Sequence, residues 1–375
     1  LGALMALVLV FAPLMRSGQT PLAMLLLEML AVGLLLAVFW LPKGMARVTT
    51  RELVGILALL ILPVLYLVPL PAALVATLPG RAEYQAVIDL VTGGAENGWR
   101  PMSLYPQETL SAWLALLPPV AVYLGTRASG GEQVLRLAMV VMVVAALQAM
   151  RGLMQYGAGS GPLFLGMDPI RRAIGTYTNP NHLAGLMELV LPIVLGLYVY
   201  SLGRRDHLAG RGGWRQRLSF LGTVRGHKAF WFGALAVLLL VGVIFTRSRA
   251  GIGLVILGIV LATLLFSRRI GGDNVYGTPG TVVAVAIGLG AAIGLAPVFD
   301  RFSAVDTVEN ARVTMWSHTL DGIGQFFPIG SGPGTYPDVF PAFQPLELGG
   351  WFINHAHNDY LEWLFEGGVL VGALM

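Results

Sequence analysis

Long apolar runs separated by shorter polar segments dominate this chain. Most runs approach the roughly 20 residues that an α-helix needs to cross a bilayer, and none shows the period-2 alternation of a membrane β-strand. The pattern predicts an all-α, polytopic transmembrane helical bundle with about ten visible helices. The runs cover residues 1–15, 20–41, 53–72, 110–126, 135–153, 181–202, 229–246, 250–267, 279–297 and 357–375. We expect about 12 helices in the full protein, with both ends trimmed here, because the chain opens without Met and stops inside an apolar run.

Composition agrees with this pattern. Hydrophobic residues make up 56% of the chain, charged residues only 12%, and the mean hydropathy is +0.73. One soluble core could not bury so much apolar surface, so we expect an integral membrane protein. Cysteine is absent, which excludes a disulfide framework, a thiol nucleophile and a thiolate metal site.

The distribution of Lys and Arg predicts the orientation. If the loops alternate sides, one set holds 14 of the 24 basic residues; these loops are 42–52, 127–136, 203–228 and 268–278. Positive charge favours the cytoplasmic side, and contact with lipid headgroups explains the basic loop Arg204 to Lys228 better than nucleic acid does. The prediction is a bundle over 1–297, a large outer loop over 298–356, and a helix from 357 that continues beyond residue 375.

The large outer loop has structure of its own. Asp306 to Asn310 resembles a helix N-terminus, and the apolar positions that follow have nearly helical spacing. We expect an amphipathic helix there, lying on the membrane surface and ending at the glycine-rich segment Pro328 to Tyr336. That segment is either an anion-binding turn, because glycine lets backbone N–H groups approach an anion, or simply a tight turn.

Arginine gathers at the predicted outer boundary of the membrane. Arg forms bidentate hydrogen bonds with phosphate and stays charged at any relevant pH, so the pattern favours a phosphate-bearing lipid as substrate. The six residues are Arg171, Arg172, Arg247, Arg249, Arg301 and Arg312. Arg171 and Arg172 could instead anchor the membrane interface. Asn179 and Asn181, around Pro180, could be helix-capping residues.

The nonapeptide from Asn354 to Glu362 carries titratable side chains where an apolar run begins, a costly position that indicates chemistry. Within it His357 is the candidate base, since a neutral imidazole titrates near the working pH. His355 either caps the helix or pairs with Asp359 four residues on. A metal site from His355, His357 and Asp359 is the less favoured alternative.

Five motifs in one order resemble the bacterial O-antigen ligase and polymerase superfamily. The resemblance covers about residues 170–375, and the first half agrees only in hydropathy. The motifs are Asn179 to Ala184, Ser248 to Gly251, Arg312 with Trp316, Pro328 to Tyr336, and His355 to Glu362 followed by Glu366 to Gly368.

The resemblance implies a metal-independent glycosyltransferase of the bacterial inner membrane with no cofactor and an active site facing the periplasm. Members take a glycan from undecaprenyl pyrophosphate; ligases pass it to lipid A-core and polymerases to another repeat unit. His357-Asn358 and Gly368 fit the ligase spacing, whereas Val371 stands where a second Gly is expected. The ligase is the favoured reading, with the polymerase as the alternative.

The chemistry gives each candidate a role. A neutral His suits the proton that the attacking sugar hydroxyl loses, and Arg suits the charge growing on the pyrophosphate. We therefore predict His357 as the general base or the residue that orients the acceptor, and Arg249 and Arg312 as the other catalytic residues, with inversion at the anomeric carbon. The predicted substrate-binding residues are Arg172, Arg247, Asn179, Asn181, His355, Asn358, Asp359, Tyr360 and Tyr336.

A solute transporter is the alternative from a different class. Carriers are expected to show broken helices near the bilayer midplane and inverted repeats. The sequence shows neither pattern, and its polar groups gather on one side.

Overall fold

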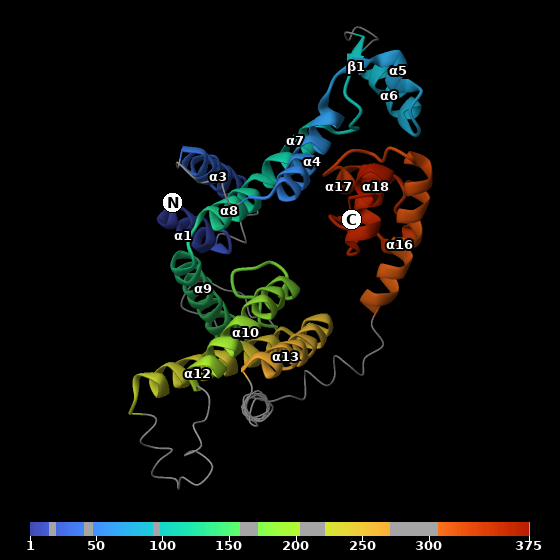
Figure 1. Ribbon diagram of the computed structural model, residues 1–375. Coiled ribbons are helices and arrows are strands. Elements are labelled where there is room, and N and C mark those ends of the chain that lie inside the picture. Colours follow the sequence, from blue (N-terminus) through green and yellow to red (C-terminus); the bar gives the residue numbers. More distant parts are fainter. Residues whose placement is uncertain are drawn as a thin grey trace. The chain divides into compact units, whose positions relative to one another are not determined.

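The computed structural model describes residues 1–14, 20–40, 48–92, 98–157, 172–202, 222–270 and 307–374. The predicted fold class is confirmed: the chain is an all-α polytopic membrane protein (Figure 1). The only strands among these residues are β1 (Leu70–Pro71) and β2 (Trp99–Arg100), a short antiparallel pair.

The described helices follow the hydropathy pattern closely. They are α1 (Gly2–Phe11), α3 (Pro21–Trp40), α4 (Thr50–Leu67), α5 (Ala72–Ala76), α6 (Arg81–Thr92), α7 (Pro106–Ala115), α8 (Leu117–Ala128), α9 (Gly131–Gly157), α10 (Pro180–Leu202), α12 (Val224–Thr246), α13 (Arg249–Ile270), α16 (Thr307–Phe326), α17 (Tyr336–Val339) and α18 (Asp359–Gly372). Two 3₁₀ turns, η1 (Phe340–Ala342) and η2 (Leu346–Leu348), lie between α17 and α18.

Six helices within the described ranges are long and apolar enough to cross a membrane. They are Pro21–Trp40, Thr50–Leu67, Pro106–Ala128, Gly131–Gly157, Pro180–Ser201 and Val224–Thr246. The runs at 1–15 and 250–267 also form helices, α1 and α13. The predicted helix over 279–297 lies outside the described residues, as do Arg171 and Arg301.

Local sequence signals explain where several helices begin. Thr49 and Glu52 form a reciprocal capping box at α4, in which each side chain accepts the other's backbone N–H. Thr223 caps α12 by accepting from the N–H of Gly226 at 3.0 Å. Each cap satisfies backbone donors that have no partner inside the helix.

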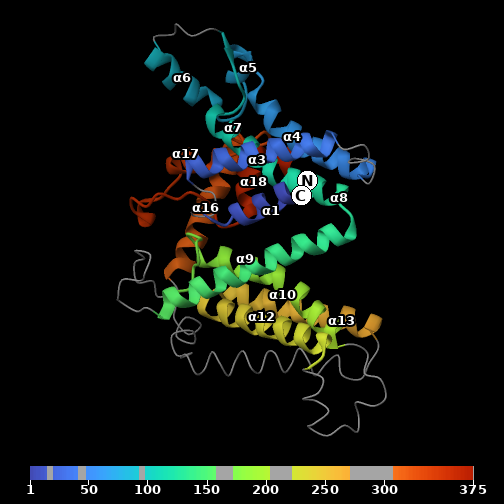
Figure 2. The ribbon, with the colours of Figure 1, turned by 90° about the vertical axis from the view of Figure 1, so that its left-hand side faces the viewer.

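The described chain forms two compact units. The first unit comprises residues 28–129 and 305–375, and the second comprises 2–27 and 130–304. In the second unit α10 packs against both α12 and α13, and α9 packs against α10 and α12 (Figure 2). Small residues permit this close approach: a side chain on Gly242 would collide with Met187.

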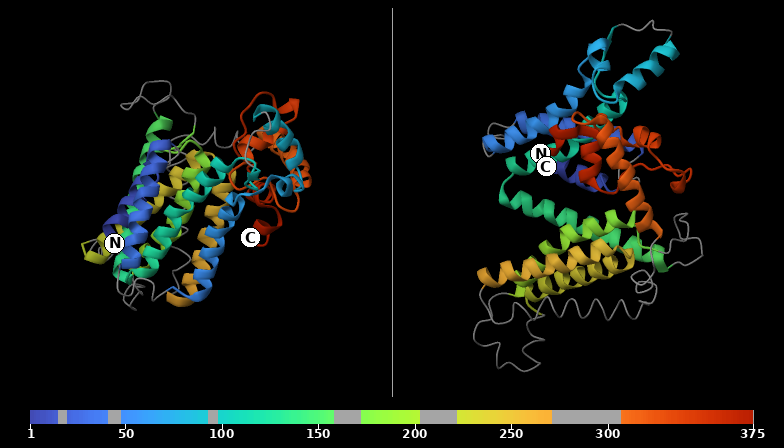
Figure 3. Two further views of the ribbon diagram at one scale, coloured as in Figure 1. Left: turned by 90° about the horizontal axis from the view of Figure 1, so that it is seen from above. Right: turned by 90° about the vertical axis from the view of Figure 1, so that its right-hand side faces the viewer.

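The first unit joins two segments far apart in the chain. Figure 3 shows residues 66–109 beside the C-terminal segment that carries α16, α17 and α18. The hydroxyl of Tyr66 donates to the carbonyl of Ile329 at 2.5 Å and is 3.1 Å from that of Gly367. The N–H of Leu104 donates to the carbonyl of Ser331 at 3.0 Å. The glycine-rich segment 328–336 therefore lies between the two halves of this unit.

The apolar run at 357–375 begins as predicted with a helix, but α18 has only 14 residues and changes direction at Gly368, where φ is +54°. A side chain on Gly368 would collide with the backbone of Pro328 and Ile329. Glycine at this position thus lets α18 pack directly against the glycine-rich segment. The predicted domain limits at 297 and 356 stay a prediction.

Candidate functional site

The segment from Asn354 to Asn358 runs into the N-terminus of α18 in the first unit. Asn358 is the N-cap: its side-chain oxygen accepts from the N–H of Leu361 at 3.4 Å. Asp359 and Tyr360 form the first helical positions, and both are exposed. Because the helix begins only at Asp359, His355 and His357 lie in the non-helical approach segment that precedes it.

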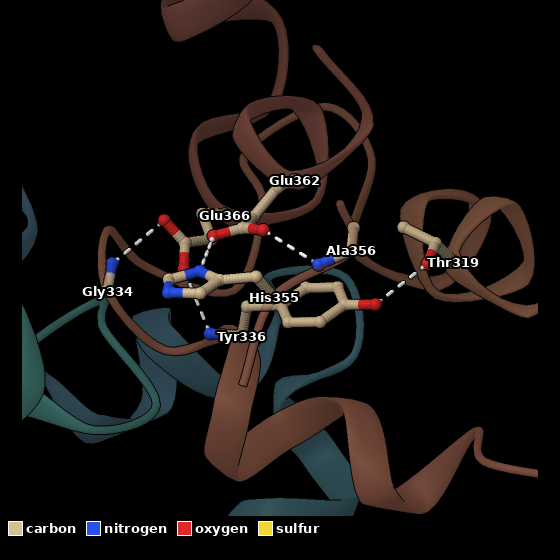
Figure 4. A network of polar contacts seen from close by, with 7 residues as sticks. All are labelled: Thr319, Gly334, Tyr336, His355, Ala356, Glu362 and Glu366. Carbon is tan, nitrogen blue, oxygen red and sulfur yellow. Dashed lines mark hydrogen bonds and ion pairs between the residues drawn. The ribbon is translucent and has the colours of Figure 1, made fainter. Parts of the chain in front are cut away.

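One carboxylate organises this approach. Glu362 accepts from the backbone N–H of Ala356 at 2.8 Å through one oxygen, and its other oxygen lies 2.8 Å from Nδ1 of His355 (Figure 4). This hydrogen bond raises the pKa of His355 above its ordinary value, against the opposing effect of burial. The partner of His355 is therefore Glu362. The alternatives from sequence, a pair with Asp359 or a cap at His355, are corrected because the helix starts after both histidines.

The Ala356 peptide is held from the other side as well. Trp316 on α16 donates its indole N–H to the carbonyl of Ala356 at 2.8 Å, and Ala356 itself is fully buried. His357 follows with an exposed side chain and a left-handed backbone, with φ at +52°. A non-glycine residue adopts this conformation only where its surroundings impose it.

Arg312 lies on α16 one helical turn before Trp316, so the two share a face of that helix. Its Nε is buried and has no hydrogen-bond partner in the described part of the chain. A buried guanidinium nitrogen without an acceptor is costly. Trp316 thus joins α16, the helix that carries Arg312, to the segment that carries His355 and His357.

The predicted anion-binding turn already holds an internal carboxylate. Glu366, one turn after Glu362 on α18, accepts from the N–H groups of Gly334 and Tyr336, each at 2.9 Å (Figure 4). The segment 328–336 does present backbone donors to an anion, and that anion is a side chain of the same unit.

Tyr336, predicted as a substrate-binding residue, lies in the core of the first unit. Its ring is fully buried, stacks on Phe340, and places its hydroxyl 3.0 Å from that of Thr319. Burial raises the pKa of the Tyr336 phenol above its ordinary value. Surrounded in this way, the Tyr336 ring packs within the core of the first unit, and its substrate-binding role stays a prediction.

The sequence analysis missed Arg81, which supports the same turn. Arg81 is 2% exposed and donates to the carbonyl groups of Pro79, Met102 and Gly330, the last at 2.5 Å. Burial lowers the pKa of Arg81 to about 10, so the guanidinium stays charged at neutral pH. No motif marks this residue, because its partners are backbone carbonyls of distant segments.

The second unit collects the remaining predicted arginines at the junction of α12 and α13. Arg247 ends α12 in a left-handed conformation, with φ at +54°, and its guanidinium lies 5.6 Å from the ring centre of Tyr156. Its Nε is buried without a hydrogen-bond partner among the described residues. Arg172 donates to the carbonyls of Thr246 and Arg247 at 3.2 and 3.1 Å. Arg249 is the first residue of α13.

The capping interpretation holds for Asn179. Its side-chain oxygen accepts from the N–H of Asn181 at 2.9 Å, at the start of α10. Asn181 itself is exposed. A polar stripe on α9 fixes the loop before α10, since Gln148 bonds to Thr176 and Gln155 bonds to Gly175.

Within the described ranges, no group of three or more His, Asp or Glu side chains is arranged to hold a metal ion. The site residues found here are an exposed histidine, a carboxylate-bound histidine and several arginines. This set can accept a proton and bind an anion.

Residues 234–375 match the family model Wzy_C, described as O-antigen ligase. The match confirms the family resemblance seen in the motifs over this part of the chain. The match supports a membrane enzyme of the O-antigen ligase or polymerase type. No curated protein and no solved structure gave a significant match.

Proposed function

For a chain with an O-antigen ligase domain at its C-terminal end, we propose a glycosyltransferase of the bacterial inner membrane that uses a lipid-linked donor. It moves a glycan from undecaprenyl pyrophosphate to the lipid A-core of lipopolysaccharide, with its active site facing the periplasm. The observation that carries this proposal is the exposed His357, set in a left-handed conformation beside a peptide that Trp316 and Glu362 hold on both sides.

The proposed reaction is a direct displacement. The acceptor hydroxyl oxygen forms a bond to the anomeric carbon, its proton passes to His357, and the bond from that carbon to the phosphate oxygen breaks. The pyrophosphate leaves with the electron pair, so the anomeric configuration inverts. General base catalysis of this kind typically contributes about 10²- to 10⁴-fold in rate.

The arginines are assigned to the leaving group. Arg312, whose buried Nε lacks an acceptor among the described residues, is assigned to the charge that develops on the pyrophosphate. Arg249 keeps the same predicted role from its sequence motif alone. Arg172 and Arg247 assist them. Asn181, Asn358, Asp359 and Tyr360 remain proposed substrate contacts; the first and the last two are exposed.

The test uses purified protein in lipid nanodiscs with a lipid-linked glycan and an acceptor, without added metal or nucleotide. We expect a glycan-acceptor product from the wild type and none above background from His357→Ala or Arg249→Ala. His318→Ala and Arg136→Ala are matched controls, because both side chains lie outside the proposed site and pair with neighbouring carboxylates. Full activity in both site variants would overturn the assignment.

The choice of acceptor separates the ligase from the polymerase. Lipid A-core alone should be glycosylated if the protein is a ligase, whereas transfer only to a second lipid-linked repeat unit would identify a polymerase. Uptake of a labelled solute into proteoliposomes, without any glycan transfer, would favour a transporter.

A further inference from the structure

Glu362 lies in an unusual environment for a carboxylate in the first turn of a helix. Such residues usually face solvent and interact with the positive end of the helix dipole, but the Glu362 side chain is only 14% exposed. A buried carboxylate is stable only when hydrogen bonds replace its water. Glu362 has two such bonds, to His355 and to the peptide of Ala356.

Capping does not explain these bonds. Asn358 already caps α18, so Glu362 is not needed to satisfy the first N–H groups of the helix. Glu362 instead reaches back six and seven residues, to Ala356 and His355, which precede the helix (Figure 4). Its carboxylate therefore sets the geometry of the approach segment.

The two carboxylate oxygens of Glu362 bond to different groups, one to the His355 ring and the other to the peptide before His357. One binds Nδ1 of His355, which leaves Nε2 as the ring nitrogen without a partner among the described residues, on a side chain that is 58% exposed. The other holds the N–H of Ala356, while Trp316 holds the carbonyl of the same residue. That carbonyl belongs to the peptide bond joining Ala356 to His357. These bonds therefore fix the orientation of the peptide that leads into His357.

We propose that Glu362 is a positioning residue for both histidines: it orients the imidazole of His355 as a hydrogen-bond donor toward substrate, and through Ala356 it holds His357 in its left-handed conformation. This inference rests on the proposed function of His357, and it adds a defined task for His355. With Nδ1 bound to the carboxylate, the Nε2–H of His355 donates to an oxygen of the substrate while His357 accepts the proton.

Charge around His355 supports this assignment. The titratable groups that act on its imidazole are Glu362, Glu366 and Asp359, all carboxylates on α18, and all raise its pKa. The hydrogen bond to Glu362 is the largest of these effects, and together they outweigh the opposing effect of burial. These carboxylates therefore favour the charged form of His355, the form that donates through both ring nitrogens.

Two substitutions at Glu362 separate its two bonds. The amide oxygen of Glu362→Gln can still accept from Ala356 but no longer carries the charge that protonates His355. Glu362→Ala removes both interactions. Glu347→Gln is the matched control, because Glu347 is an exposed carboxylate in η2 of the same unit.

The first readout is the titration of His355 by nuclear magnetic resonance, with histidine labelled in the intact protein in nanodiscs and the signal assigned with His355→Gln. We expect the midpoint to move to lower pH in both Glu362 variants and to stay in place in Glu347→Gln. The resonances of His357 should move in Glu362→Ala and remain near their wild-type positions in Glu362→Gln.

The second readout is glycan transfer. A displaced catalytic group typically costs on the order of 100-fold, so we expect kcat to fall by about that factor in Glu362→Ala, with a smaller change in KM. Glu362→Gln should lose less activity but show a shifted pH profile.

Two results would overturn the proposal. One is an unchanged His355 midpoint in Glu362→Ala, whatever the transfer rates are. The other is an active wild type whose kcat and pH profile survive both Glu362 substitutions. If the wild type transfers no glycan while the titration shifts as expected, the proposed function fails and the positioning of the two histidines by Glu362 is supported.

Discussion

Arg247 and His357 are the two non-glycine residues with a left-handed backbone in the described ranges, at φ of +54° and +52°. The first ends α12 in the second unit, where a left-handed residue is a common way to terminate a helix. The second lies before the cap of α18, where no helix ends and nothing in the secondary structure requires it. The same strain thus has a structural explanation at Arg247 and lacks one at His357.

The side chains of Arg247 and His357 also differ in their surroundings. The carbonyl of Arg247 accepts from Arg172, and its guanidinium lies against Tyr156. His357 is exposed, and the preceding residue, Ala356, is held by hydrogen bonds from Trp316 and to Glu362. An exposed side chain that follows a peptide fixed by hydrogen bonds is the arrangement expected of a group that must meet a substrate.

Glycine at each position tests this contrast most directly, because glycine keeps the left-handed backbone and removes only the side chain. His357→Gly should lower transfer by about 10²- to 10⁴-fold, the range for a general base. Arg247→Gly should lower transfer by about tenfold, as expected for loss of one assisting charged hydrogen bond. Rates measured with the same donor and acceptor check both values, and equal losses would remove the contrast.

Arg312→Lys asks whether the guanidinium on α16 does more than supply charge. Lys keeps the charge but cannot form two parallel hydrogen bonds with a phosphate. We expect a loss of kcat of about 10- to 100-fold, less than the 10²- to 10³-fold typical when a charge-stabilising donor is removed completely. Single-turnover rates measure this step, and Arg127→Lys, in the first unit but paired with Glu52, is the control.

Trp316→Phe tests the hydrogen bond to Ala356 with little change in ring packing. The carbonyl of a fully buried residue would lose its donor, which costs about 1–3 kcal/mol when no substitute exists. We expect a lower denaturation midpoint together with slower transfer. Trp363→Phe on α18, an exposed indole, should change neither, and an unaltered midpoint in Trp316→Phe would show that the bond contributes little.

The pair of His355 and Glu362 predicts a pH dependence of stability. The pKa of His355 is raised in the folded protein, so the pair stabilises the fold fully below the unfolded pKa of about 6.5. This contribution is lost as pH rises through the folded pKa. Thermal unfolding of wild type and Glu362→Gln should therefore differ most at low pH and converge at high pH, and a constant gap would contradict the ion pair.

Much of the fold could be predicted from hydropathy, because a spanning helix needs only length and apolar character. The helix over Thr307–Phe326 followed from its start signal after Asp306 and its stop before Pro328. The candidate segment 354–362 was predicted from its polar residues at the edge of an apolar run, and its chemical role stays a prediction. These features are local in sequence, and local spacing is what such patterns report.

The contacts that complete the site could not be predicted in this way. Spacing suggested Asp359 as the partner of His355, but that holds only inside a helix, and His355 lies in the non-helical segment before α18. The sequence left open whether the glycine-rich segment offers backbone donors to an anion, and nothing in it indicates that Glu366 takes them. Arg81 and Gly330 are 249 residues apart and meet only through tertiary packing.

The bond from Arg81 to Gly330 also bears on how such a protein can be divided. The family match begins at residue 234, but the glycine-rich turn at 328–336 accepts hydrogen bonds from Tyr66, Arg81 and Leu104, which lie before it. A fragment cut at residue 234 would leave those carbonyls without partners. In a chimera of two relatives, the segment around residues 66–104 and the turn at 328–336 would have to come from the same parent, because hydrogen bonds join them.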